Sequence, residues 1–319
     1  MIMADRPESK FEVIRQATMQ DNNLLSISVM CEIAGVSRSG YYRWLAHKDA
    51  RNQREKRDQA DFDLILSAYK FRGYAKGARS IYMRLLHLDP PLVMNIKKIR
   101  RLMKKYYLHC PVRKANPYRR MAKAMKTSHV APNLLNRQFR AFGPRKVLLT
   151  DITYLFFGKG EKCYLSVIMD AFTKQVLAYV PSQSLEVDFV INTVTMLIED
   201  HGISLNASTI INSDQGSHYT SYKFIEIIND AGLRQSMSRR ANCWDNAPQE
   251  SFFGHMKDEI NIENCASFEQ VCATIHDWMD YYNNDRCQWE LAKLSPNEYA
   301  NYIRTDIYPL SIAPPKKED

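Results

Sequence analysis

The sequence lacks the features that mark several protein classes. It has no uninterrupted apolar run of the roughly 20 residues that a membrane-spanning helix needs, and its acidic N-terminal segment has no secretory pattern. Its seven cysteines form no C-x-x-C pair, so we expect free thiols and no zinc site. A phosphate-binding loop, a dinucleotide-binding glycine fingerprint and a Ser/His/Asp arrangement are also missing. We therefore expect a cytoplasmic protein without these cofactor sites.

Acidic residues are scarce in the first half of the chain. Residues 1–150 carry 31 Lys and Arg against 11 Asp and Glu, a net charge of +20, whereas residues 151–319 carry 13 against 24, a net charge of −11. Between Asp89 and Asp151 there are sixteen Lys or Arg residues and no acidic one. A bias of this length is unusual for an ordinary solvated helix face. It predicts contact with a polyanion, DNA or RNA.

The 319 residues exceed the size at which a single hydrophobic core usually stops growing, so several segments are expected. Changes in apolar pattern, proline content and charge place the boundaries between them. We expect an N-terminal helical region with a helix-turn-helix-like segment (1–60), a basic helix-turn-helix-like domain (61–110), a basic proline-containing linker (111–143), a core domain (144–266), a C-terminal helical extension (267–305) and a tail (306–319).

Two short helices are expected on either side of a turn at Gly35. We expect Val29, Ile33 and Val36 to face inward. Outward positions are expected for Arg38, Ser39, Tyr41 and Arg43, of which Arg38 and Arg43 would contact DNA. The segment resembles a small helix-turn-helix. A helical hairpin without a DNA role fits this segment about equally well.

A strongly basic helix is expected to begin at Asn95. Apolar residues recur on one face, at Ile96, Ile99, Leu102 and Met103. Cations occupy the rest of the helix, at Lys97, Lys98, Arg100, Arg101, Lys104 and Lys105. A merely solvated basic helix would normally interleave glutamates for i,i+4 pairing, and this one has none. We therefore expect the helix to contact a phosphate backbone.

From Lys146 onward the sequence changes to β-branched, apolar runs. Strands are expected over 147–157, 163–169, 176–180, 210–211 and 233–237, and helices over 187–199, over 222–231 and from about Ala247. The order β-β-β-α-β-α-β-α is that of a ribonuclease H-like core, an α/β fold in which helices cover a mixed sheet. The expected fold is therefore this core, preceded by an all-α region of the helix-turn-helix type.

Three carboxylates lie where these elements end or begin. Asp151 follows an apolar strand run, Asp214 follows the strand at 210–211, and Glu250 lies at the start of the last helix. Carboxylate oxygens hold Mg²⁺ or Mn²⁺ rather than Zn²⁺, and two such ions suit phosphoryl transfer. Lys257 is seven residues beyond Glu250, on the same helix face, where its ammonium would hold a phosphate.

Simpler interpretations of the same acids remain open. Asp151 and Asp214 also fit turn-capping aspartates, and Glu250 fits a first-turn acid favoured by the helix dipole. We expect Asp170 to begin the turn into the third strand. Asp258 and Glu259 are expected to face solvent.

Several motifs together resemble the integrase-core transposases of bacterial insertion sequences, specifically the second-reading-frame product called OrfB. The motifs are Thr150-Asp151-Ile152-Thr153-Tyr154, Ser213-Asp214-Gln215-Gly216-Ser217 and Asp245-Asn246-Ala247-Pro248-Gln249-Glu250-Ser251-Phe252-Phe253. The resemblance implies that Asp151, Asp214 and Glu250 form a catalytic triad (DDE motif) for two Mg²⁺ ions, with Mn²⁺ able to substitute. It further implies that Lys257 contacts the terminal DNA of the element, that water nicks a strand and that a 3′-hydroxyl then joins it to a target.

The resemblance also implies partners and a location. The partners would be double-stranded DNA at the element ends and the target, further copies of the chain on that DNA, and the upstream reading-frame product. The protein would be bacterial and nucleoid-associated. Alternatives are a non-catalytic DNA-binding regulator of transposition, a partial transposase that needs fusion to the upstream product, and a structure-specific nuclease that cuts without joining.

Overall fold

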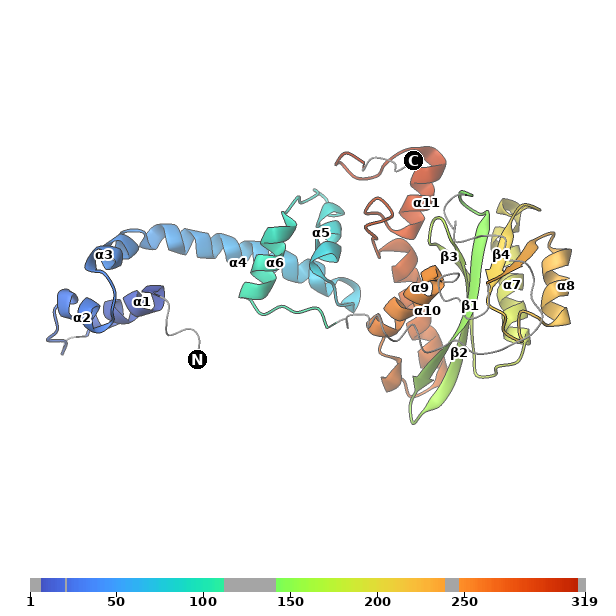
Figure 1. The fold of residues 1–319 in the computed structure, drawn as a ribbon, viewed down its shortest axis with the longest axis horizontal. Helices are drawn as coiled ribbons and strands as arrows, with labels where there is room; N and C mark the ends of the chain where they lie inside the picture. Colours follow the sequence, from blue (N-terminus) through green and yellow to red (C-terminus); the bar gives the residue numbers. More distant parts are fainter. Residues whose placement is uncertain (1–6, 21, 112–141, 239–246, 315–319) are drawn as a thin grey trace. The chain divides into compact units, whose positions relative to one another are not determined.

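The computed structural model describes residues 7–20, 22–111, 142–238 and 247–314 (Figure 1). These residues fall into two compact units, one ending at Leu66 and one beginning at Ser67. Most of the expected linker (111–143) and the loop before the expected last helix lie outside the described residues.

The first unit contains α1 (Pro7–Thr18), α2 (Ile27–Ile33), α3 (Arg38–Ala46) and the beginning of α4 (Lys48–Lys70). Serine residues begin two of these helices. The Ser26 hydroxyl accepts a hydrogen bond from the backbone N–H of Val29 at 3.4 Å, and the Ser37 hydroxyl accepts one from Gly40 at 3.1 Å. Two short helices on either side of Gly35, which has a φ of 63°, confirm the expected helix pair.

The inward face predicted for α2 was wrong. Val29 and Ile33 are 40% and 73% exposed, whereas Met30 and Cys31 are buried in the core of this unit. The outward position expected for Tyr41 was also wrong, because Tyr41 is buried in the same core. The apolar residues of the seven-residue helix α2 occur on all of its sides, so its sequence does not define a single inner face. Packing against Phe11 and other residues of α1 decides which side is buried.

The second unit begins with a helical part. The end of α4 is followed by the short 3₁₀ turn η1 (Phe71–Gly73), then by α5 (Ala78–Leu86) and α6 (Ile96–Lys105). The Asn95 side chain begins α6 by accepting the N–H of Lys97 at 2.8 Å. The apolar face expected for α6 is confirmed, since Ile99, Leu102 and Met103 are buried.

A five-stranded mixed sheet forms the core of the second unit (Figure 1). Its strands are β1 (Val147–Phe157), β2 (Glu161–Asp170), β3 (Val176–Ser182), β4 (Ile210–Ser213) and β5 (Arg234–Met237), in the order β3-β2-β1-β4-β5. The first three strands are antiparallel, and β4 and β5 continue the sheet parallel to β1. This topology and the order of elements confirm the expected ribonuclease H-like core.

Helices cover both faces of the sheet. One face packs against α7 (Asp188–His201) and α8 (Tyr222–Asp230), and the other packs against α9 (Ala247–Glu259) and α10 (Phe268–Asn284) (Figure 1). Side chains alternate between the faces of a strand, so Val147 and Leu149 join the α9 and α10 side, whereas Leu148 joins the α7 and α8 side.

The remaining elements are the 3₁₀ turns η3 (Gly202–Ser204) and η5 (Ile262–Asn264) and the helix α11 (Pro296–Thr305). A capping box begins α11. Ser295 accepts the N–H of Glu298, and the Glu298 carboxylate accepts the N–H of Ser295. None of the helices in the described parts of the chain has the length and apolar character that crossing a membrane requires.

Candidate functional site

Strand pairing brings Asp151 and Asp214 to the same level of the sheet. Leu149 of β1 lies opposite Asn212 of the parallel strand β4. Each aspartate lies two residues further along its own strand direction, so both acids lie at the same level of the sheet. The expectation that Asp151 lies where a strand ends was wrong, because β1 continues to Phe157. Asp151 is half-buried within β1, and Asp214 is exposed just beyond the end of β4.

Backbone amides orient both carboxylates. Asp214 Oδ1 accepts the N–H of Gly216 at 2.8 Å, and Asp151 Oδ1 accepts the N–H of Ile152 at 2.8 Å. A Cβ atom at Gly216 would lie 2.9 Å from Asp214 Oδ1, so only glycine fits this turn without moving the carboxylate. Asp214 is thus held by a turn, and Asp151 by the next amide of its own strand.

The Tyr219 hydroxyl lies near both aspartates. Tyr219 is 1% exposed, and its hydroxyl is 3.5 Å from Thr150 Oγ1. Burial raises the pKa of Tyr219 well above its usual value, and the negative charges of Asp151 and Asp214 raise it further. Tyr219 therefore remains neutral at ordinary pH. The sequence analysis missed this residue because it lies outside every motif.

The side chain of Gln249 anchors the start of α9 on the sheet. Gln249 is fully buried, and its Nε2 donates to the backbone oxygen of Val167 at 3.4 Å. Val167 of β2 lies directly opposite Asp151 of β1. Glu250, the next residue of α9 after Gln249, is exposed, so the anchor brings the third acid to the region of Asp151. Asp151 shares the strand face of Leu149, which is the face that α9 covers.

Replacement of Gln249 by methionine tests this anchor. We expect a loss of about 1 kcal/mol in the free energy of unfolding, the usual net value of one hydrogen bond, because methionine fills most of the same volume. Any activity that depends on Glu250 should fall more than this small loss of stability explains. Urea unfolding and an assay on the same preparation measure both quantities. Equal activity in the two proteins would contradict a positioning role for Gln249.

Lys257 occupies the face of α9 expected for it. It is exposed, seven residues beyond the exposed Glu250, while Phe252, Phe253 and Met256 pack the opposite side against the sheet. The basic residues expected to contact DNA fall into two sets. Arg38 and Arg43 are exposed on α3 of the first unit. The α6 cations belong to the second unit and are exposed except for the half-buried Lys98.

Two further acids, Asp170 and Glu259, are buried and bonded to neighbouring groups. Asp170 is fully buried and accepts the N–H groups of Arg145 and Phe172, each at 2.8 Å, which confirms that it begins the turn after β2. Glu259 was expected to face solvent, and this was wrong. Its side chain is 7% exposed and binds Arg286 through two nitrogens, at 2.8–3.1 Å, and Trp278 Nε1 at 3.0 Å. The chain after α10 covers the end of α9, which the local sequence does not indicate.

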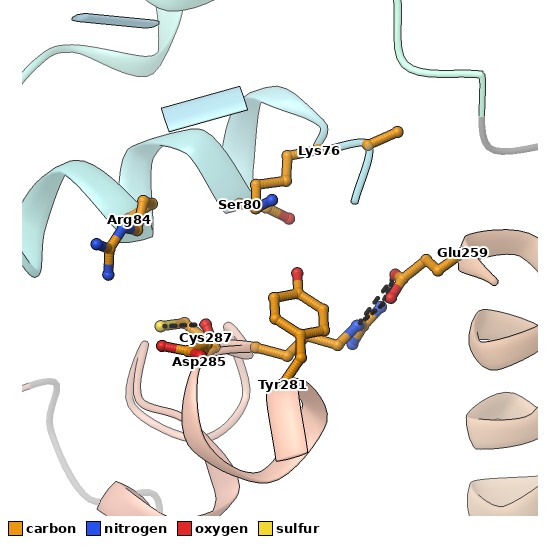
Figure 2. A pocket seen from close by; sticks show the side chains of 9 residues that line it. Lys76, Ser80, Arg84, Glu259, Tyr281, Asp285 and Cys287 are labelled. Atoms are coloured by element: carbon orange, nitrogen blue, oxygen red, sulfur yellow. Dashed lines mark hydrogen bonds and ion pairs between the residues drawn. The ribbon is translucent and has the colours of Figure 1, made fainter. Parts of the chain in front are cut away.

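A small pocket next to this ion pair lies between α5 and the end of α10 (Figure 2). Lys76 lies on the α5 side of it and Tyr281 on the α10 side. The Lys76 amine is buried and donates to the backbone oxygens of Tyr74, at 2.7 Å, and of Phe71. Burial lowers its pKa to about 8. Because backbone carbonyls already bind the amine, we interpret the pocket as part of a packed junction.

Arg72 makes a second connection across this junction. Its guanidinium binds Asp285 at 3.0 Å and also binds Asp280 of α10. The Tyr74 hydroxyl donates to Asp277 at 2.5 Å, and the Tyr74 ring lies 4.4 Å from that of Tyr281. These contacts join the helical part of the second unit to α10.

Comparison with known proteins agrees with this architecture. The chain matches the family described as "Integrase core domain" over residues 121–243, and a second family of the same description over residues 250–302. A transposase-like protein of Haemophilus influenzae is 36% identical over 216 residues, which cover 66% of this chain and 95% of that protein. The transposase InsF for insertion sequence IS3A of Escherichia coli K12 is 29% identical over 280 residues, covering 86% of this chain and 94% of that protein. Among solved structures, the intasome of simian T-cell lymphotropic virus aligns with a TM-score of 0.42 and 14% identity, over 71% of this chain and 73% of that chain.

The sheet topology and the two integrase-core matches define the class of the second unit as an integrase-type core. The chain belongs to the integrase-core transposases of bacterial insertion sequences. Membership in this family implies polynucleotidyl transferase activity. Asp151 and Asp214 lie in the first matched region, and Glu250 is the first residue of the second.

Proposed function

We propose that this chain cleaves the DNA strands at the ends of an insertion sequence and joins them to target DNA, using Asp151, Asp214 and Glu250. The observation that carries the proposal is the register between β1 and β4, which places Asp151 and Asp214 at the same level of the sheet. The Gln249 anchor, which brings Glu250 to the same region, supports it.

The three side chains fit divalent metal ions. All their donor atoms are carboxylate oxygens, which Mg²⁺ and Mn²⁺ prefer over Zn²⁺. The two aspartates lie at the same level on neighbouring strands, where one cation could be shared between their carboxylates. Two bound Mg²⁺ ions would supply Lewis-acid activation of the attacking oxygen and stabilise the departing one.

The residues of this chain have separate roles in the proposal. Asp151 and Asp214 hold the metal ions, and Glu250 completes one site. Backbone N–H groups keep the two aspartates oriented in advance, so little reorganisation is needed during the reaction. The Lys257 ammonium, on the exposed face of α9, holds a phosphate of the terminal DNA.

Double-stranded DNA is the proposed partner of the basic helices. On α6 the cations surround a buried apolar face and include no acid, which favours a phosphate backbone. On α3 the exposed Arg38 and Arg43 add a second DNA contact in the first unit. Two element ends must meet for joining, so we propose that further copies of the chain assemble on DNA, with the upstream reading-frame product as an additional partner.

The salt dependence of DNA binding tests the role of α6. Replacing the exposed Lys97, Arg100 and Lys104 by alanine is expected to reduce the slope of log affinity against log salt by about 3, because each phosphate contact contributes roughly 0.9. Fluorescence anisotropy of a labelled duplex between about 50 and 200 mM salt measures the slope. Lys223→Ala, which removes an exposed lysine from α8, is the control and should leave the slope unchanged. An unchanged slope in the triple variant would exclude α6 from the DNA interface.

The experiment that tests the proposed function uses labelled duplex that carries the terminal sequence of the element, with Mg²⁺ or Mn²⁺. We expect metal-dependent nicking followed by joining to a second duplex. Nicking without joining would favour a structure-specific nuclease. Binding without nicking, even with the upstream product added, would favour a regulator. Nicking and joining only after that product is added would indicate a partial transposase.

A further inference from the structure

A second group of potential metal ligands lies away from the three carboxylates. His87 follows α5, Cys287 follows α10, and Glu298 belongs to the first turn of α11. The Nε2 atom of His87 lies 3.2 Å from Glu298 Oε2 and 3.6 Å from Cys287 Sγ. All three side chains are half-buried, and one donor atom from each lies within 4.8 Å of the others. An imidazole, a thiol and a carboxylate thus share one small site.

The distances in this group match those of tetrahedral zinc coordination. With bonds of about 2.0 Å to nitrogen, 2.3 Å to sulfur and 2.1 Å to oxygen, tetrahedral angles place nitrogen about 3.5 Å from sulfur and about 3.4 Å from oxygen. The observed separations from His87 Nε2, 3.6 Å to sulfur and 3.2 Å to oxygen, are within about 0.2 Å of these values. Cys287 Sγ also lies 3.7 Å from His87 Nδ1, so binding one ion requires the Cys287 side chain to turn toward the Nε2 side; the sulfur and the Glu298 oxygen are within 4.8 Å of each other.

Neighbouring groups orient the donors as metal sites require. His87 Nδ1 lies 2.7 Å from the backbone oxygen of Met83. A carbonyl oxygen only accepts, so Nδ1 carries the proton and Nε2 keeps the lone pair that a metal ion would take, 3.2 Å from the Glu298 carboxylate. The capping box holds Glu298, because its Oε2 accepts the N–H of Ser295 at 2.8 Å. Hydrogen bonds of this kind set the orientation of metal ligands.

We propose that His87 Nε2, Cys287 Sγ and a Glu298 carboxylate oxygen bind one Zn²⁺ ion that ties α5 to the segment after α10. The nitrogen and sulfur donors favour Zn²⁺ over the Mg²⁺ that suits the three-carboxylate site. Within the described residues no other His, Cys, Asp or Glu joins this group, which leaves the fourth position to water.

The location of the site gives it a structural role. Arg72 already joins the helical part of the second unit to the end of α10 through Asp280 and Asp285. The zinc site adds a second tie between the same parts, through His87 on one side and Cys287 on the other. It would keep the basic helix pair α5 and α6 in a constant position relative to the integrase-type core.

Cobalt titration of the full-length protein tests this proposal. After removal of metals with a chelator, Co²⁺ should bind with one equivalent at high affinity and give a thiolate-to-cobalt charge-transfer band together with the visible bands of tetrahedral coordination. Zn²⁺ should displace it. Only a cysteine ligand produces the charge-transfer band, so binding of Co²⁺ at the three carboxylates is distinguishable from binding at this site.

Variants then assign the ligands. Cys287→Ser should abolish the charge-transfer band and weaken Zn²⁺ binding by more than about 100-fold, because loss of even an outer partner of a ligand weakens binding about 10- to 100-fold. Glu298→Gln should keep the band and bind Zn²⁺ less tightly. Cys272→Ser, which changes another half-buried cysteine, is the matched control and should behave as the wild type. Absence of the band from the wild-type protein, or its survival in Cys287→Ser, would overturn the proposal and leave the three groups as a hydrogen-bonded cluster without metal.

Discussion

Replacement of Asp214 by asparagine is expected to lower the rates of DNA nicking and joining by about 1,000-fold or more. Asparagine keeps the shape of the side chain and can still accept the N–H of Gly216, so the turn after β4 should persist. The charge that holds a divalent ion is lost, however. Metal ions contribute several kcal/mol of transition-state stabilisation, and about 4 kcal/mol corresponds to a factor of about 1,000.

Asp188→Asn provides the matched control for this experiment. Asp188 is an exposed acid at the start of α7, paired with Lys223 at 3.0 Å. Its replacement should leave nicking and joining unchanged. Circular dichroism and duplex binding by the Asp214→Asn protein should match the wild type, which separates loss of chemistry from loss of fold. Persistence of nicking at more than about a tenth of the wild-type rate would remove Asp214 from the metal site.

Replacement of Arg286 by methionine is expected to lower the free energy of unfolding of the second unit by about 3–5 kcal/mol. Arg286 makes a bidentate ion pair with Glu259, and the two side chains are only 17% and 7% exposed. Without the guanidinium, the buried Glu259 carboxylate loses its positive partner. Of the side-chain donors described above, it keeps Trp278 Nε1. The cost of this uncompensated charge exceeds the attraction that the pair contributed.

Urea unfolding, followed by tryptophan fluorescence, measures this effect. The control is again Asp188→Asn, which breaks an exposed pair and should cost about 0–1 kcal/mol. Glu259→Gln combined with Arg286→Met should be less destabilised than the sum of the single variants, since the second change removes the unpaired charge. A loss below about 1 kcal/mol in Arg286→Met would show that solvent reaches Glu259 and that the pair does not stabilise the end of α9.

Much of the core was predictable because local pattern and local structure agree there. The run of apolar and β-branched residues from Val147 to Phe157 predicts its strand correctly: residues 147–150 are all buried, and burial alternates from Thr153 to Phe157. The Gly35 turn with its capping serines likewise marks the ends of α2 and α3. The predicted buried face was wrong at α2, because apolar residues occur on all sides of that helix. Only contact with α1 decided that Met30 is buried and Ile33 is not.

For the candidate site, the sequence indicated the residues but not how they lie relative to one another. Asp214 follows the end of β4 and Glu250 lies in the first turn of α9, so their positions could be read from the sequence, whereas Asp151 lies inside β1, where an apolar run precedes it. The spatial relation of the three acids could not be read from it, because it depends on the register between β1 and β4 and on the anchor from Gln249 to Val167. No sequence feature indicated that Tyr219 lies near the site, since a tyrosine after a turn usually packs into the core.

The sequence by itself determined the order of strands and helices, the separation of charge between the two halves of the chain, and the three candidate acids of the core. Those properties depend on residues close together in the chain. The tertiary structure alone decided that Glu259 pairs with Arg286 and that His87, Cys287 and Glu298 converge. These residues lie up to 211 positions apart. Packing of the chain after α10 against the end of α9 brings Glu259 to Arg286, and its packing against the end of α5 brings Cys287 to His87.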